Sequence, residues 1–198
     1  IKFQLDALAP ELGVALRFSI AALAVLAWCA ARGISLAMPR RVHALLAAIG
    51  LLGFCISYFF VYHAERFIVS GLVAVGYAGA PLVNMVLARL LLGTPMSRRV
   101  AAGGLLGLTG IGLVFWPEFS RMQADGPLVI GASLTAGAVL ASCMSNIGMA
   151  RVQGAGIKGW APLGVAMAWG AVLSWLSVLL FGRPLSIQWS LPFVASLL

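Results

Sequence analysis

Charged residues are scarce in this sequence of 198 residues, since only 9% are Asp, Glu, Lys or Arg and only five are acidic. Soluble globular proteins have about 25% charged residues. Thirteen basic and five acidic side chains cannot cover a water-exposed surface for this chain length, and 62% of the residues are hydrophobic. The composition therefore excludes a soluble enzyme, a disordered tail and a disulfide-stapled secreted domain, and it predicts an integral membrane protein.

Sequence motifs of known catalytic and metal-binding sites are also missing. The sequence has no P-loop, HExxH, GxSxG or metal-ligand cluster. Cys29, Cys55 and Cys143 lie within apolar runs without CxxC spacing, which is typical of small packing residues. The net charge of +8 is spread in ones and twos, unlike the clustered basic face that nucleic acid requires. We therefore expect no catalytic residue, metal, cofactor or nucleic-acid partner.

Long apolar runs are what the sequence has instead. About 20 apolar residues in a helix cross a hydrocarbon core of about 30 Å. The runs are continuous and rich in Ala and Leu, which favours helices over the short alternating strands of a membrane barrel. Six runs are long enough to span the membrane: 12–31, 42–62, 67–92, 100–116, 127–150 and 160–181. A seventh run starts near Leu191. The predicted fold is an all-α, multi-spanning membrane bundle with about six complete spans and a truncated seventh.

The charges predict the orientation of these spans. Basic residues without any acid occupy the connections after the first, third and fifth runs: Arg32, Arg40, Arg41, Arg98, Arg99, Arg151 and Lys158. The opposite side has all five acids: Asp6, Glu11, Glu65, Glu118 and Asp125. By the positive-inside rule the first side is cytoplasmic, so topology accounts for the net charge.

Small and polar residues form a stripe on the third run. Ser70, Ala74, Tyr77, Pro81 and Asn84 recur at spacings of three and four, which places them on one face of a helix. Proline removes a backbone hydrogen bond, and a broken helix at membrane depth is tolerated only where protein or a cavity covers it. We expect Tyr77 and Asn84 to line a cavity, with tight helix packing as the alternative for the smaller residues.

The second and fifth runs also contain polar residues. Tyr58 lies deep in the second run, whereas Tyr62 lies near its outer end, where an aromatic anchor at the interface is expected. Ser142 and Asn146 share a polar face of the fifth run, and an amide in hydrocarbon must bond to a neighbouring helix or to water. The predicted substrate pathway comprises Tyr58, Tyr77, Pro81, Asn84, Ser142 and Asn146.

The fourth run has a different pattern. Gly103, Gly107 and Gly110 recur with the small-residue spacing that lets two helix backbones approach closely. We therefore predict that these three glycines make this run a packing helix that does not line the pathway.

The segment from Ala64 to Glu118 resembles the end of an EamA domain of the drug/metabolite transporter superfamily. It has an Ala-rich helix with a central Ala80–Pro81, a short basic turn, and the glycine helix GxxLGxxGIxL from Gly103 to Leu113. The earlier pair Arg17–Phe18 is similar to part of that family's second helix. The resemblance implies ten helices in two inverted five-helix repeats, with substrate bound between them. Residues 1–118 would form the first repeat without its first helix, and 119–198 the truncated start of the second.

The resemblance further implies a secondary transporter and not an enzyme, located in the bacterial inner membrane. It would move a small polar metabolite by alternating access, and efflux of an amino acid or related compound is one form of this activity. The alternative is a membrane scaffold that does not transport, or a lipid-handling membrane enzyme. Many members of the family have Glu at the position of Thr94. Whether a carboxylate has a role at the cytoplasmic mouth of such a transporter therefore stays open. The expected partners are the lipid bilayer and a small molecule, whereas substrate, direction, coupling ion and oligomeric state stay open.

The predicted orientation can be tested with single cysteines in a background without the three native ones. Cysteines at Ser97 and Gly156 should resist a membrane-impermeant thiol reagent in intact cells, whereas a cysteine at Ala124 should react. Permeabilised cells provide the control, because all three positions should then be labelled. Labelling of Ser97 and Gly156 alone in intact cells would mean that the orientation is inverted.

Overall fold

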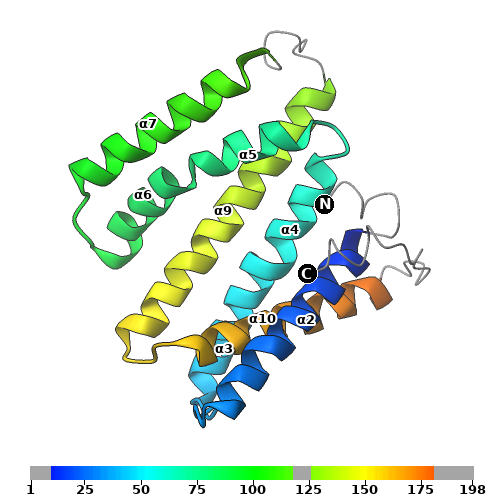
Figure 1. Cartoon of the computed structure of the whole chain (residues 1–198), viewed down its shortest axis with the longest axis vertical. Helices are drawn as coiled ribbons and strands as arrows, with labels where there is room; N and C mark the ends of the chain where they lie inside the picture. Colours follow the sequence, from blue (N-terminus) through cyan, green and yellow to red (C-terminus); the bar gives the residue numbers. More distant parts are fainter. Residues whose placement is uncertain (1–9, 118–125, 181–198) are drawn as a thin grey trace.

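The computed structural model describes residues 10–117 and 126–180, so the predicted seventh span near Leu191 lies outside the described part. Within these two ranges the chain is helical and has no strand. Its helices, in chain order (Figure 1), are α2 (Pro10–Ala31), α3 (Arg40–Gly50), η1 (Leu51–Ile56), α4 (Ser57–Ala64), α5 (Ser70–Ala78), α6 (Ala80–Leu92), α7 (Arg98–Val114), α9 (Gly126–Gly154) and α10 (Trp160–Leu180).

Local sequence signals account for several helix ends. α2 begins at Pro10, in the first turn where the missing N–H of proline costs nothing. α6 ends at Leu92 and is followed by Gly93, whose φ of +69° is the left-handed conformation that favours glycine. α7 begins after Ser97, whose side chain accepts a hydrogen bond from the Val100 amide. Turn chemistry therefore sets the connection between α6 and α7.

Most of the predicted spans are present in the structure. The stretches long and apolar enough to cross a membrane are Glu11–Ala31, Arg40–Ala64, Ser70–Leu92, Gly126–Gly154 and Trp160–Leu180. The fourth predicted run forms α7, which at 17 residues is shorter than the other five stretches. The ends of successive spans alternate between the lower left and the upper right of Figure 1, as a multi-spanning chain requires. The prediction of a helical membrane bundle is thus confirmed.

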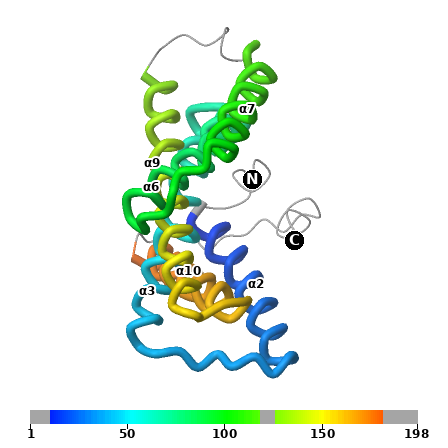
Figure 2. The backbone as a smooth tube through the Cα atoms, turned by 90° about the vertical axis from the view of Figure 1, so that its left-hand side faces the viewer, coloured from blue at the N-terminus to red at the C-terminus, as the bar shows by residue number. Residues whose placement is uncertain are grey.

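Helix α9 lies in the middle of the described structure. In Figure 1 it separates α5, α6 and α7 on one side from α2 and α10 on the other, and Figure 2 shows α7 in the upper part of the molecule and α2 and α10 in the lower part. α9 packs against α3, η1, α4, α5 and α6, while α10 packs mainly along α2. Side chains from several spans therefore meet along α9.

The second span is not a regular α-helix, because the π-helical turn η1 separates α3 from α4. Close backbone contacts surround this turn. A Cβ at Gly50 would meet the Ala166 carbonyl of α10, and one at Gly53 would meet Ser145 of α9. The Ser145 hydroxyl donates to the Ile49 carbonyl, just before the wide turn, at 3.0 Å. Single π-turns in long helices often mark functional sites, and this one holds the span tightly against α9 and α10.

The three glycines of α7 that were predicted to pack against another helix make no close contact with a neighbouring helix among the described residues. No described atom lies within 4 Å of a Cβ built at Gly103, Gly107 or Gly110. The close approach on α7 is at Gly104, where a Cβ would lie 2.8 Å from Leu82 of α6. Packing by the three predicted glycines therefore stays a prediction.

The contact between η1 and α9 predicts that Gly53→Ala destabilises the protein. The added methyl group displaces the Ser145 side chain and its hydrogen bond, and overpacking of this kind costs about 1–3 kcal/mol. Denaturant unfolding of the purified protein in one detergent measures the difference. Gly154→Ala on α9 is the matched control, because its Cβ would meet no described atom within 4 Å. Equal stability of the two variants would contradict the close-packing interpretation.

Candidate functional site

A cavity of about 330 Å³ lies among α4, α5 and α9, and we call it the polar cavity. Its walls contain three serines, two tyrosines and one acid beside three small apolar residues. The lining residues are Ser57, Tyr58, Val61, Glu65, Ser70, Val73, Ala74, Tyr77 and Ser142. Hydroxyl groups at membrane depth are suited to bind a polar molecule, because hydrocarbon offers them no other partner.

Helix α5 places three of the five residues of the predicted stripe in this cavity. Ser70, Ala74 and Tyr77 line it, as the spacing of three and four predicts. The helix then breaks at Gly79, between α5 and α6, and Pro81 lies in the first turn of α6. The predicted break near Pro81 is thus observed. Pro81 and Asn84, which follow the break, are not among the residues that line the cavity.

Ser57 joins three helices at the cavity wall. It is 1% exposed, and its hydroxyl donates to the Ala138 carbonyl of α9 at 3.0 Å. The same oxygen lies 2.7 Å from the Tyr77 hydroxyl of α5. A carbonyl only accepts and a serine has one proton, so Tyr77 must donate its proton to Ser57. The Tyr77 oxygen therefore keeps its lone pairs as acceptors.

Aromatic packing fixes the position of Tyr58. Its ring lies edge-on to Phe18 of α2 at 4.8 Å between centroids, and Phe18 also contacts Phe54 at 4.9 Å. Tyr62, expected to be an anchor at the outer interface, is instead fully buried with Phe18 and Ala171. That expectation was wrong because α2 and α10 cover this face of α4.

Glu65 is the functional candidate that the sequence analysis missed. In the sequence Glu65 is one of the acids of an outer connection, but the structure places it on the wall of the polar cavity. It caps the C-terminal end of α4, seven residues after Tyr58. Residues at i and i+7 share a helix face, so this spacing was a usable signal.

The other predicted pathway residues lie outside the polar cavity. Pro81 is exposed. Asn84 on α6 has a buried side-chain oxygen without a hydrogen-bond partner among the described residues. Asn146 was expected to point inward but is exposed, because its neighbour Ser145 takes the buried position. The structure thus brings Tyr58, Tyr77 and Ser142 together, and the pathway roles of all six residues stay predictions.

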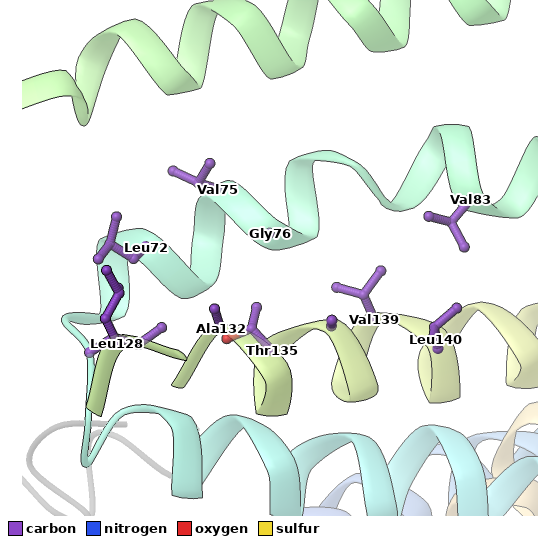
Figure 3. A pocket seen from close by; sticks show the side chains of 11 residues that line it. Leu72, Val75, Gly76, Val83, Leu128, Ala132, Thr135, Val139 and Leu140 are labelled. Carbon is purple, nitrogen blue, oxygen red and sulfur yellow. The ribbon is translucent and has the colours of Figure 1, made fainter. Parts of the chain in front are cut away.

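A larger, apolar cavity of about 500 Å³ lies between α9 and the opposite face of α5 and α6 (Figure 3). Leu72, Val75 and Val83 are part of its wall. Thr135 contributes the only hydroxyl among its described lining residues, and that hydroxyl already donates to the Gly131 carbonyl at 2.8 Å. This cavity is therefore less suited to a polar ligand than the smaller one.

These features define a helical membrane protein with a polar cavity between three of its spans. The sequence pattern of the EamA-like transporter family matches residues 1–116, and the chain belongs to that family. A comparison with curated proteins gives no match. A solved structure titled only "Crystal structure of protein" is similar to this chain, with a TM-score of 0.75 at 23% identity. The similarity covers 99% of this chain and 66% of the other, and it shows the fold.

The bonds of Ser57 predict energetic coupling between Ser57 and Tyr77. Ser57→Ala should lower the free energy of unfolding by about 1–2 kcal/mol, because it removes both contacts of a buried hydroxyl. In a double-mutant cycle with Tyr77→Phe, the two effects should fall short of additivity by about 0.5 kcal/mol or more. Ser133→Ala is the control, since that exposed hydroxyl bonds only within its own helix. Additive effects of Ser57→Ala and Tyr77→Phe would contradict the coupling.

Proposed function

We propose that this protein is a secondary transporter that moves a small polar metabolite across the bacterial inner membrane by alternating access. The observation that carries the proposal is the meeting of Tyr58, Tyr77 and Ser142, from three different helices, around one cavity. Membership of the EamA-like transporter family supports it. Efflux of an amino acid or a related compound is one form of this activity.

The proposed repeats place the cavity where a transporter of this type binds its substrate. If residues 1–118 belong to the first repeat and 119–198 to the second, Tyr58 and Tyr77 come from one repeat and Ser142 from the other. Inverted-repeat transporters bind substrate at such an interface near the membrane midplane. The chain spans 66% of the length of its structural relative, and the ten-helix arrangement is part of the proposal.

The break between α5 and α6 supplies a hinge for the proposed motion. At this break the Cys143 thiol of α9 donates a hydrogen bond to the Ala80 carbonyl, with 3.6 Å between sulfur and oxygen. A thiol is a weak donor, so this link between α9 and the break resists movement less than a hydroxyl would. α6 would tilt relative to α5 about Gly79, and the Ser57–Tyr77 bond links α5 to α4.

Asn84 is the residue of α6 that we expect to make a polar contact during the transport cycle. Its buried side-chain oxygen has no hydrogen-bond partner among the described residues. An unpaired amide oxygen in hydrocarbon is costly, so we propose that it gains a partner when the protein changes conformation or binds substrate.

Transport by the full-length protein in proteoliposomes tests the proposal. A panel of labelled amino acids and related polar metabolites is screened for protein-dependent counterflow, and the initial rate is then measured for variants. The combined change Tyr77→Ala and Asn84→Ala should lower that rate at least about tenfold, because two polar contacts are worth about 1–3 kcal/mol. Thr109→Ala on α7 is the control, since its exposed hydroxyl bonds only to the Leu105 carbonyl.

Two results would contradict different parts of this proposal. No counterflow of any compound above that of empty vesicles would contradict transport of this substrate class. Normal transport by a well-expressed double variant would leave transport standing and contradict the assigned residues.

A further inference from the structure

A groove lies between α2 and α10, at the end of the bundle that the charge pattern predicts to be cytoplasmic. It has a volume of about 240 Å³ and is lined by Ala24, Val25, Trp28 and Trp160. Trp28 lies in the last turn of its span, and Trp160 is the first residue of the other span. None of these residues lines the polar cavity or the apolar cavity. The groove is therefore a separate feature at the level of the membrane–water interface.

The walls of this groove are apolar and face outward from the helix pair. Trp28 is 51% exposed and Trp160 is 57% exposed. The two helices touch one turn further into the span, where a Cβ at Gly164 would lie 2.9 Å from Val25 of α2. Pockets that hold a whole drug-sized ligand measure about 300–1,000 Å³. A smaller, outward-facing apolar groove is suited to a segment of one lipid acyl chain.

Arg32 places a charged donor group beside the groove. Its guanidinium carbon lies over the Trp28 ring, 4.5 Å from the ring centroid, in a cation–π contact. A guanidinium held over an aromatic face keeps its N–H donors, because they lie in its own plane. Within residues 10–117 and 126–180, the Arg32 side chain has no ion-pair or hydrogen-bond partner. Trp28 thus positions a cation for an acceptor that this part of the protein does not supply.

The charges around Arg32 favour an anionic acceptor. The acids in the described part of the chain, Glu11 and Glu65, lie on the opposite side of the membrane in the predicted topology. Lys158 is exposed and precedes Trp160 by two residues, so a second positive charge lies at the same end of the groove. A single tryptophan at an interface is an ordinary anchor. Basic pockets between spans on the cytoplasmic side, in contrast, bind anionic lipid headgroups.

We infer that this groove binds an anionic phospholipid. One acyl chain lies between the two indoles, and the headgroup phosphate accepts hydrogen bonds from Arg32 and Lys158. A guanidinium matches phosphate oxygens in a bidentate geometry, and its bonds to an anion are about twice as strong as neutral ones. The bound lipid contacts both α2 and α10. This site is independent of the polar cavity and of the proposed transport.

The experiment compares two phospholipids with the same acyl chains, anionic dimyristoylphosphatidylglycerol and zwitterionic dimyristoylphosphatidylcholine. Native mass spectrometry of the full-length protein in detergent measures the dissociation constant of the first bound lipid. The phosphatidylglycerol should bind about tenfold more tightly, because each nearby basic side chain adds to the affinity for an anionic headgroup. Arg32→Gln should weaken phosphatidylglycerol about fivefold and phosphatidylcholine less than about twofold. Arg99→Gln is the matched control, since it removes an exposed charge on the same predicted side, at the start of α7, and should change neither constant.

A second pair of variants tests the acyl-chain groove. Ala24→Leu should weaken both lipids about threefold or more, because the larger side chain fills the groove. Ala30→Leu is its control, since Ala30 is also exposed on α2 but does not line the groove. Glycerol 3-phosphate, which has the phosphate without acyl chains, should not displace the bound phosphatidylglycerol.

Four outcomes would overturn the inference. They are equal affinity for the two lipids, equal losses in Arg32→Gln and Arg99→Gln, unchanged binding in Ala24→Leu, and displacement of the lipid by glycerol 3-phosphate. The last of these would mean that the basic residues bind a free phosphate and that the groove holds no acyl chain.

Discussion

The Ser57 hydroxyl has one proton, and in the interior of a membrane bundle the partner of that proton determines which helices stay together. Here the partner is the Ala138 carbonyl of α9, and Tyr77 of α5 completes the chain of bonds. Hydrocarbon would leave each of these groups unsatisfied at a cost of several kcal/mol. The polar cavity therefore depends on α4, α5 and α9 being held at hydrogen-bonding distance, and the same bonds make its wall an acceptor surface.

The close approach of the second span to α9 makes this bond possible. Gly53 and Ser57 are four residues apart and share a helix face, while their partners Ser145 and Ala138 follow in reverse order along α9. The two helices thus run antiparallel with matching contact points. A side chain larger than hydrogen at Gly53 would push the helices apart one turn from Ser57. Together, the π-turn, Gly53 and Ser57 determine the position of this wall of the polar cavity.

Periodicity predicted this site only as far as the helix remained regular. Ser70 and Tyr77 share a face in the sequence and line the polar cavity in the structure, but the break at Gly79 separates Asn84 from them. Tyr62 was misplaced because hydropathy indicates depth and not which neighbouring helix covers a residue. Glu65 was overlooked because a charge at a helix end was counted for topology and not projected onto the face of Tyr58. Tertiary neighbours, absent from a single sequence, determine each of these outcomes.

The two cavities lie on opposite faces of α5, and this arrangement bears on the proposed mechanism. Tyr77 faces the polar cavity and its neighbour Gly76 faces the apolar one, where a Cβ would meet Thr135 of α9. A movement of α5 relative to α9 would therefore enlarge one cavity at the expense of the other. The apolar side offers no free hydroxyl among its described residues to bind α5, so lipid or apolar side chains can fill it without losing hydrogen bonds. On the polar side the same movement would stretch the Ser57–Tyr77 bond, and a ligand bound between α4, α5 and α9 would oppose it. Ligand occupancy would thus bias the position of α5, which is the coupling that alternating access requires.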